Sequence, residues 1–243
     1  MLFETLERRG MRSVTVVEGY PGFFEVHGDD GPNLIEISVD MVEHTFALDG
    51  QTYGNVSFIS VWAYGGDDGI IVNTGSPYAT ISAVVHGADG DDFLSLNFDG
   101  AIWAGEGNDT VFLRDAFRGE VYAGGGDDTA YMNGANIEAV VYGEVGNDSL
   151  LAGGNNHGIY IYGGVRNDLL YGSAHADFLD GGHGRDTIHG GGGNDTLSGG
   201  NGDDRLYATF PNAELYAVGG DGHDQLYNYY GTMTVSGVEE LYT

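Results

Sequence analysis

The sequence contains no cysteine and no lysine, only 4 prolines, and no apolar run of membrane-spanning length. Without cysteine, neither a disulfide framework nor a thiolate metal site can form. A membrane-spanning helix needs about 20 consecutive apolar residues. We therefore expect no membrane insertion, and any metal site must use oxygen or imidazole ligands.

Acidic residues and glycine are abundant instead. Aspartate and glutamate number 37 against 8 basic residues, for a formal net charge of -29, and the 243 residues include 44 glycines. Such a charge repels nucleic-acid phosphates and anionic lipid and attracts cations. We therefore expect no nucleic-acid partner, and several bound cations to offset the charge.

Residues 163–207 form five nine-residue units placed end to end. Three of them, beginning at Gly181, Gly190 and Gly199, fit G-G-x-G-x-D-x-U-x, where U is a large aliphatic residue. Glycine allows a tight loop to adopt positive φ, and a sixth-place aspartate supplies the hard oxygen that Ca²⁺ prefers. A flexible glycine-rich linker would not keep an aspartate and an inward-pointing aliphatic residue in fixed phase. The sixth-place aspartates are Asp168, Asp177, Asp186, Asp195 and Asp204.

These units resemble the calcium-binding nonapeptide repeats of RTX, or hemolysin-type, proteins. The resemblance implies an all-β, right-handed parallel β-roll (a β-solenoid) with stacked loops that bind several Ca²⁺. We expect an extracellular or cell-surface location. Because ligand carboxylates stacked without metal repel one another, we expect folding to be coupled to calcium.

If nine residues make half a coil, alternate aspartates lie on opposite edges of the roll. Outside residues 163–207 the loop recurs once per coil, at intervals of 17 to 24 residues. This spacing predicts one long row of calcium ligands on a single edge, whereas the other edge has only Asp177 and Asp195 among turns of variable length. The predicted row is Asp68, Asp92, Asp109, Asp128, Asp148, Asp168, Asp186, Asp204 and Asp224.

Some loops depart from the pattern. Arg166 and His175 replace the fourth-place glycine, so each must adopt an unfavourable backbone or distort its loop. Asn33 takes the sixth place of a degenerate loop at residues 28–35, which we expect to lack a full ion site.

The chain is predicted to be one structural domain. Residues 1–62 would form a strand-rich N-terminal cap continuous with the solenoid, and residues 63–243 the calcium-binding β-roll, because a solenoid needs an atypical end to cover its core. Residues 6–13, LERRGMRS, resemble the LEPR-XLL element of large extracytoplasmic repeat proteins of planctomycete-type bacteria. Arg8 replaces a proline of that element, and Arg12 replaces a leucine.

The registration also predicts aromatic rows on both outer faces of the roll. One interpretation is that aromatic side chains favour strands and stack on neighbouring rungs. The other is a contact surface for a second protein copy or for sugar rings. The residues of the possible contact surface are Trp62, Trp103, Tyr122, Tyr142 and Tyr162.

Catalytic signatures are missing from the sequence. It has no G-x-S-x-G elbow and no P-loop, its 8 histidines are scattered, and its paired carboxylates lie in loops rather than across a cleft. We therefore expect no enzyme, and hypothesise a calcium-binding extracellular structural protein, a surface or self-assembling component. The alternative is a calcium-dependent adhesin or carbohydrate-binding module that uses an aromatic face.

Overall fold

The computed structural model describes residues 3–6, 14–40, 43–74, 81–114, 118–134, 138–154, 157–208, 214–228 and 232–242. Regular structure within these ranges is entirely β-strand, so they contain no helix long and apolar enough to cross a membrane. The predicted turns around residues 115–117, 135–137, 155–156, 209–213 and 229–231 lie outside the described residues. So do residues 7–13 of the LEPR-XLL-like segment.

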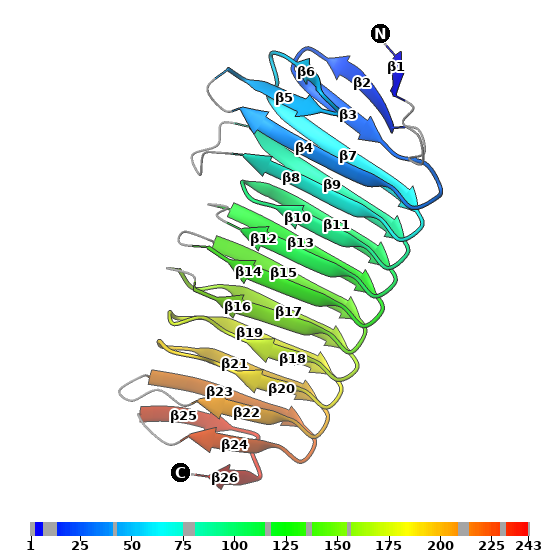
Figure 1. Cartoon of the computed structure of the whole chain (residues 1–243). Helices are drawn as coiled ribbons and strands as arrows, with labels where there is room; N and C mark the ends of the chain where they lie inside the picture. The colour runs from blue at the N-terminus through cyan, green and yellow to red at the C-terminus, as the bar shows by residue number, and fades with distance from the viewer. Residues whose placement is uncertain are drawn as a thin grey trace.

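Two long sheets form the two broad faces of a rod (Figure 1). In strand order, the first sheet contains β1 (Phe3–Leu6), β2 (Val14–Tyr20), β3 (Phe23–His27), β7 (Phe58–Gly65), β9 (Ser82–Asp89), β11 (Gly100–Glu106), β13 (Arg118–Gly125), β15 (Glu138–Val145), β17 (Tyr160–Val165), β19 (Phe178–His183), β21 (Thr196–Asn201), β23 (Glu214–Asp221) and β25 (Thr232–Ser236). The second contains β26 (Glu240–Tyr242), β24 (Gln225–Asn228), β22 (Arg205–Ala208), β20 (Thr187–His189), β18 (Leu169–Tyr171), β16 (Ser149–Gly153), β14 (Thr129–Asn133), β12 (Thr110–Arg114), β10 (Phe93–Leu96), β8 (Gly69–Thr74), β4 (Leu34–Asp40), β5 (Thr45–Leu48) and β6 (Gln51–Tyr53).

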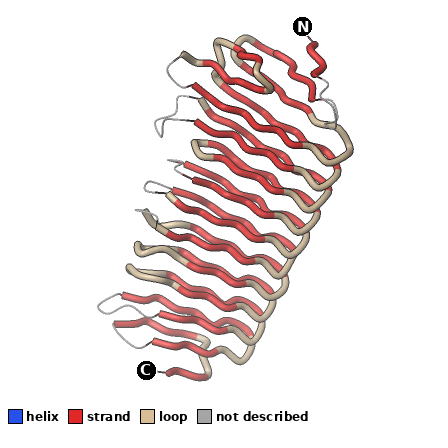
Figure 2. The backbone as a smooth tube through the Cα atoms, in the orientation of Figure 1, coloured by secondary structure: helices blue, strands red, loops and turns tan. Residues whose placement is uncertain are grey.

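From β7 onward the chain alternates between the sheets, and every strand pairs in parallel with the strand one coil away. Figure 2 shows short, similar turns along one edge of the rod. On the other edge the described turns are uneven, from residues 97–99 to residues 190–195. The predicted all-β parallel solenoid is confirmed. Its right-handedness stays a prediction.

The core lies between the sheets. Side chains alternate between buried and outward positions, as in β9, because successive residues of a strand point to opposite faces. Burying each large aliphatic side chain contributes about 1.5–3 kcal/mol. The predicted inward eighth-place residues Leu170, Leu179, Ile188, Leu197 and Leu206 are all 0% exposed.

The N-terminal end differs from the rest of the rod. Strands β1, β2 and β3 pair antiparallel in the first sheet, and β4, β5 and β6 do so in the second. Because β3 and β4 also pair in parallel with β7 and β8, the parallel roll already begins within residues 1–62.

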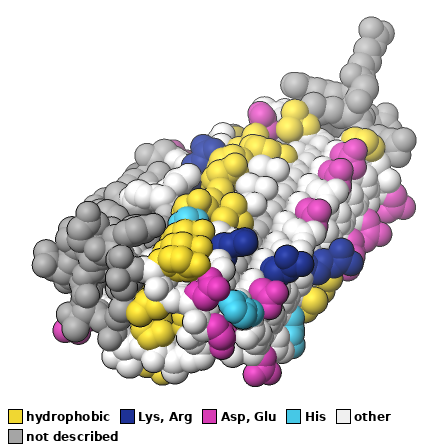
Figure 3. Space-filling model, turned by 90° about the horizontal axis from the view of Figure 1, so that it is seen from below, with side chains coloured by type: hydrophobic (Ala, Val, Ile, Leu, Met, Phe, Trp, Pro, Cys, Tyr) yellow, Lys and Arg dark blue, Asp and Glu magenta, His cyan; other side chains and the backbone are white. Residues whose placement is uncertain are grey.

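The predicted aromatic row on the first sheet exists as a self-stacked column. Trp62 stacks on His86 with ring centroids 3.6 Å apart, and Trp103 stacks on Tyr122 at 3.9 Å. Tyr142 and Tyr162 continue the column at 5.0–5.1 Å. A second column on the other sheet runs through Tyr171, His189, Tyr207, Tyr227 and Tyr242 at 4.2–4.8 Å. Figure 3 shows hydrophobic side chains in a band along the face in view.

Candidate metal centre

The nine predicted aspartates do lie in one row, at the edge with short turns, which we call the ladder edge. In each rung one carboxylate oxygen, Oδ1, accepts a hydrogen bond from the backbone N–H of the aspartate in the preceding rung. These eight bonds measure 2.7–2.9 Å and run from Asp68 through Asp92, Asp109, Asp128, Asp148, Asp168, Asp186 and Asp204 to Asp224.

The other oxygen of every ladder aspartate, Oδ2, is buried and has no hydrogen-bond partner among the described residues. The nine residues are 0–3% exposed. A buried acceptor without a donor is costly, and a buried unpaired charge costs more still. The same lack of a donor for a buried oxygen therefore recurs in all nine rungs.

Burial is the largest cause of a raised carboxyl pKa in every rung. The hydrogen bond to Oδ1 lowers the pKa in part, and neighbouring carboxylates raise it further. The pKa rises to about 6 in Asp128 and Asp204, to about 7 in Asp92, Asp109, Asp148 and Asp186, and to about 8 in Asp168; in Asp68 and Asp224 it rises as well. These carboxyls must be protonated or neutralised by a cation.

Backbone carbonyls face the same places as the unpartnered oxygens. The point that a Cβ on Gly163 would occupy lies 2.5 Å from Asp168 Oδ2 and 2.7 Å from the carbonyl oxygen of Gly181 in the next rung. Asp148 and the carbonyl of Gly163 converge in the same way on Gly143. A cation between these two acceptors, or a proton on the carboxyl, would compensate for the missing donor.

This donor set fits Ca²⁺, which takes carboxylate and carbonyl oxygens in flexible geometry. No group of three or more acidic or histidine side chains gathers at one point among the described residues. Each ion would therefore be held by ladder carboxylates together with carbonyls of the adjoining loops. A bound ion would supply positive charge to the buried Oδ2 atoms and join neighbouring rungs.

Arg166 shows how a non-glycine residue fits the ladder edge. It replaces the fourth-place glycine and adopts φ of +93°, so this loop keeps the ladder geometry at a conformational cost. The expected unfavourable backbone is thus observed. His175 is not among the positive-φ residues, and its loop closes differently.

The edge with uneven turns, which we call the second edge, brings Asp177 and Asp195 together. Asp195 Oδ1 accepts from the backbone N–H of Asp177 at 3.0 Å. Asp177 differs from a ladder aspartate because both of its oxygens have donors: the N–H of Ser173 at 2.6 Å on Oδ2, and the N–H of Ile159 at 2.9 Å and the Ser173 hydroxyl at 3.0 Å on Oδ1. Calcium ligation by these two aspartates stays a prediction.

The ladder continues past the predicted residues at both ends. At the N-terminal end the backbone N–H of Asn33 donates to Asp68 Oδ1 at 2.5 Å. At the C-terminal end the N–H of Asp224 donates to Glu239 Oε2 at 2.7 Å. Sequence reasoning missed Glu239. The signal was present, since Gly237, Glu239 and Leu241 occupy the fourth, sixth and eighth places of a last degenerate unit.

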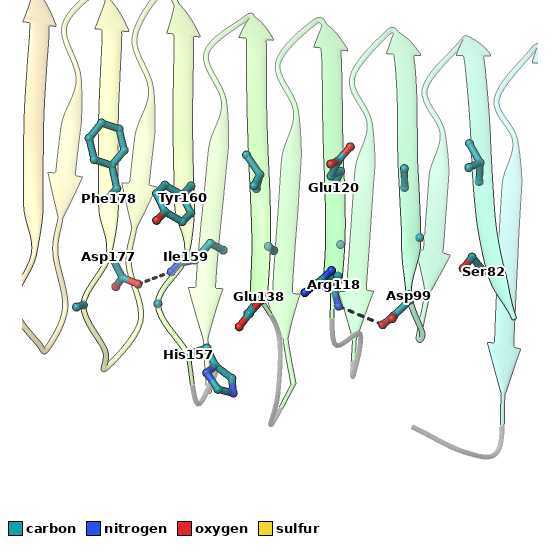
Figure 4. Close-up of a pocket in the computed structure, with 18 of the residues that line it drawn as sticks. Ser82, Asp99, Arg118, Glu120, Glu138, His157, Ile159, Tyr160, Asp177 and Phe178 are labelled. Carbon is teal, nitrogen blue, oxygen red and sulfur yellow. Dashed lines mark hydrogen bonds between the residues drawn. The ribbon is translucent and has the colours of Figure 1, made fainter. Parts of the chain in front are cut away.

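A groove of about 1070 Å³ crosses the outer face of the first sheet, on the side of the second edge (Figure 4). Its wall toward the turns carries Asp99, Arg118, Glu138 and His157. Tyr160, the first residue of β17, is 54% exposed and lines the same groove. This groove is separate from the ladder edge and offers polar and aromatic groups together.

Comparison with known families agrees with the geometry of the ladder edge. The sequence model described as "RTX calcium-binding nonapeptide repeat (4 copies)" matches residues 101–115, 160–188 and 180–209. No curated protein gives a significant match. The predicted resemblance to RTX repeats is confirmed, and the structure continues the same loop geometry beyond the matched residues, from Asp68 to Asp224.

Proposed function

We propose that this chain, which carries RTX calcium-binding nonapeptide repeats, is an extracellular structural protein whose folded rod depends on Ca²⁺. The observation that carries the proposal is the row of nine buried Oδ2 atoms without a donor. Once ionised, these carboxylates either bind cations or repel one another. Calcium is thereby part of the structural framework of the rod.

A calcium titration tests this function and its location. Far-UV circular dichroism would follow folding as calcium is added to the chelated protein. Extracellular calcium modules bind at about 10⁻⁴–10⁻³ M, and cytosolic sensors at about 10⁻⁷–10⁻⁵ M. We expect a midpoint in the extracellular range. Folding that needs no calcium would contradict the proposal, and a midpoint below about 10⁻⁶ M would contradict the extracellular location.

We propose further that the protein is not an enzyme. Every buried carboxylate of the described residues belongs to the ladder edge or to the Asp177–Asp195 pair. Carboxylates engaged in this way hold rungs together rather than face a substrate. A screen with generic glycoside and ester substrates, in the presence of calcium, is expected to show no turnover.

Self-association is proposed at the C-terminal end of the rod. Among the described strands, β25 and β26 each pair with one strand, and Leu241, which continues the inward column, is 49% exposed. Unpaired strand edges promote pairing with another chain. Analytical ultracentrifugation with calcium is expected to show association that Leu241→Lys weakens and that Val165→Lys, at the end of the mid-rod strand β17, does not. A monomer at all concentrations would contradict this step.

Carbohydrate binding is the second candidate function, and the groove supports it better than the aromatic column. Rings of the column stack mainly on one another, so their faces are occupied, whereas Tyr160 is 54% exposed beside polar groove residues. A glycan array is expected to show binding that Tyr160→Ala weakens and that Tyr171→Ala, on the other sheet, leaves unchanged. Loss on Trp103→Ala or Tyr122→Ala instead would assign the ligand to the column.

A further inference from the structure

The side-chain amide of Asn33 lies inside a cage of oxygen atoms at the start of the ladder. Its Nδ2 is 2.6 Å from the carbonyl oxygen of Gly31, 3.0 Å from that of Asp29, 3.4 Å from that of Ala63 and 3.1 Å from Asp68 Oδ1. Asn33 is 7% exposed. Two carbonyls come from its own loop, and the other two oxygens come from the next rung.

This nitrogen takes the place that Oδ2 takes in the other rungs. The point that a Cβ on Gly28 would occupy lies 2.8 Å from Asn33 Nδ2 and 3.0 Å from the carbonyl oxygen of Ala63. In the rung of Asp168 the equivalent point lies between Oδ2 and the equivalent carbonyl of the next rung. A donor has replaced an acceptor at the same position. Asp68 Oδ1 and the carbonyls around Asn33 therefore have a donor supplied by the protein.

We infer that the Asn33 amide replaces the calcium ion in the first interval, between the rungs of Asn33 and Asp68. This inference rests on the proposed calcium binding by the ladder edge. The first ion then lies between Asp68 and Asp92, and the rung formed by β3 and β4 folds onto the roll without metal. The antiparallel N-terminal end is thereby joined to the calcium-dependent part of the rod by a metal-independent rung.

The orientation of the amide is fixed by its neighbours. In the opposite orientation, Oδ1 would face the four oxygen atoms with no N–H between them. Buried acceptors without a donor are energetically costly, so this orientation is disfavoured. In the observed orientation Oδ1 is the atom without a partner. An Asn33 that ligated an ion through Oδ1 would require the opposite orientation, so the two arrangements differ in ion number.

The test counts bound ions by native mass spectrometry at saturating calcium, supported by isothermal titration. Asn33→Asp restores the motif and is expected to bind one more ion than the wild type. Asn33→Ala is expected to bind the same number as the wild type. Asn97→Asp adds the same charge on the second edge, where Asn97 bonds to Thr74, and is expected to add no ion.

The reciprocal change is Asp92→Asn, which places an amide in the third rung, between Asp68 and Asp109, and is expected to remove one ion. It keeps the inference testable if Asn33→Asp does not fold. An unchanged ion number in a folded Asn33→Asp, an unchanged number in Asp92→Asn, or the loss of an ion in Asn33→Ala would overturn the inference. A wild type that binds no calcium would instead reject the proposed function.

Discussion

The two edges of the rod start from the same sequence motif and reach different electrostatic states. On the ladder edge each aspartate has donors for Oδ1 and none for Oδ2. On the second edge Asp177 has donors for both oxygens, two of them from Ser173. A nearby donor thus reduces the need for a cation at Asp177, where calcium ligation stays a prediction.

The second place of the motif contributes to the difference at Asp177. It does not decide it alone, since Tyr64, Ala88 and Glu144 stand there in other ladder rungs and Gly191 stands there before Asp195. Ser173 stands there on the second edge, and Gly164 and Gly182 stand there in the neighbouring rungs of the ladder edge. Serine brings a hydroxyl within 3.0 Å of Asp177 Oδ1, whereas glycine has no side chain to offer. In the first rung the side-chain amide of Asn33 donates to the buried oxygens in a related way. Two residues, Ser173 and Asn33, thus supply a donor that the ladder rungs lack.

Removal of calcium is expected to have the largest effect on the difference between the two edges. Each site held at 100 times its dissociation constant contributes about 2.7 kcal/mol, so several sites exceed the 5–15 kcal/mol, roughly, by which whole domains are stable. We expect excess EDTA at neutral pH to unfold the ladder edge, and with it the rod. Differential scanning calorimetry would register this as loss of the folding transition. An unchanged melting profile would mean that the ladder holds no structural ion.

pH has the next largest effect, and its sign differs with and without calcium. Burial raises the pKa of the Asp148 carboxyl from 3.8 to about 7, and that of Asp168 to about 8. A raised folded-state pKa means that the metal-free fold is most stable below the unfolded value, near pH 4, and loses stability as pH rises through 7.

Calcium reverses the slope, because it binds the carboxylates that protons would otherwise occupy. Thermal melts between pH 4 and pH 8 in EDTA are therefore expected to show a falling melting temperature. Calcium affinity measured over the same range is expected to rise with pH. A melting temperature in EDTA that rises with pH would contradict the buried, uncompensated carboxylates.

Single substitutions of one aspartate on each edge distinguish a carboxylate that binds calcium from one held by hydrogen bonds. Asp128→Asn removes a ladder carboxylate and is expected to lower the ion number and cost about 3–5 kcal/mol in calcium, as breaking a buried charge pair does. Asp177→Asn weakens hydrogen bonds to Ser173 and is expected to cost about 1–3 kcal/mol. That cost should be equal with and without calcium wherever the protein stays folded. Urea melts with ion counting would decide, and equal losses of calcium from both variants would remove the distinction.

Ser173→Gly gives this loop of the second edge the second-place glycine that the neighbouring ladder rungs have. It restores the second-place glycine and removes the hydroxyl from Asp177 Oδ1, so the metal-free stability is expected to fall by about 1 kcal/mol. Asp177 keeps the backbone N–H of Ile159 on Oδ1 and that of residue 173 on Oδ2, and the acceptor position vacated on Oδ1 is expected to let one further calcium ion bind with Asp195. Ser82→Gly, on the outer face of β9, is the control and should leave the ion number unchanged. An unchanged ion number in Ser173→Gly would show that more than this hydroxyl closes the second edge.

Much of this architecture follows from the spacing of aspartates alone. A fixed phase between the sixth-place acid and the eighth-place aliphatic residue sets register, and the structure pairs Trp103 with Tyr122 and Leu170 with Ile188 as that phase requires. The asymmetry between the edges was equally visible, since motif loops on the second edge occur only at Asp177 and Asp195. Repeats make such prediction possible because each rung repeats the contacts of its neighbour.

Individual hydrogen bonds could not be predicted in this way. The pattern treats Asp177 as equivalent to Asp168, because it does not show that the Ser173 N–H and hydroxyl reach the carboxylate. It also treats Asn33 as a defective site, although its amide contacts four oxygens. Glu239 was missed because its side chain is longer than aspartate and its unit lacks the leading glycines. These differences depend on side-chain reach, which a spacing rule does not contain.

The smallest expected effect concerns the fourth place of the motif. Arg166 holds φ of +93° on the ladder edge, whereas His175 on the second edge is not at positive φ. Arg166→Gly removes the strain of a side chain held at positive φ. It is expected to stabilise the calcium-bound rod by about 1 kcal/mol. His175→Gly has no such strain to relieve and is expected to destabilise slightly, because glycine gains freedom in the unfolded chain. Urea melts of the two variants in calcium would test this, and an equal change in both would show that backbone strain is not what distinguishes the two loops.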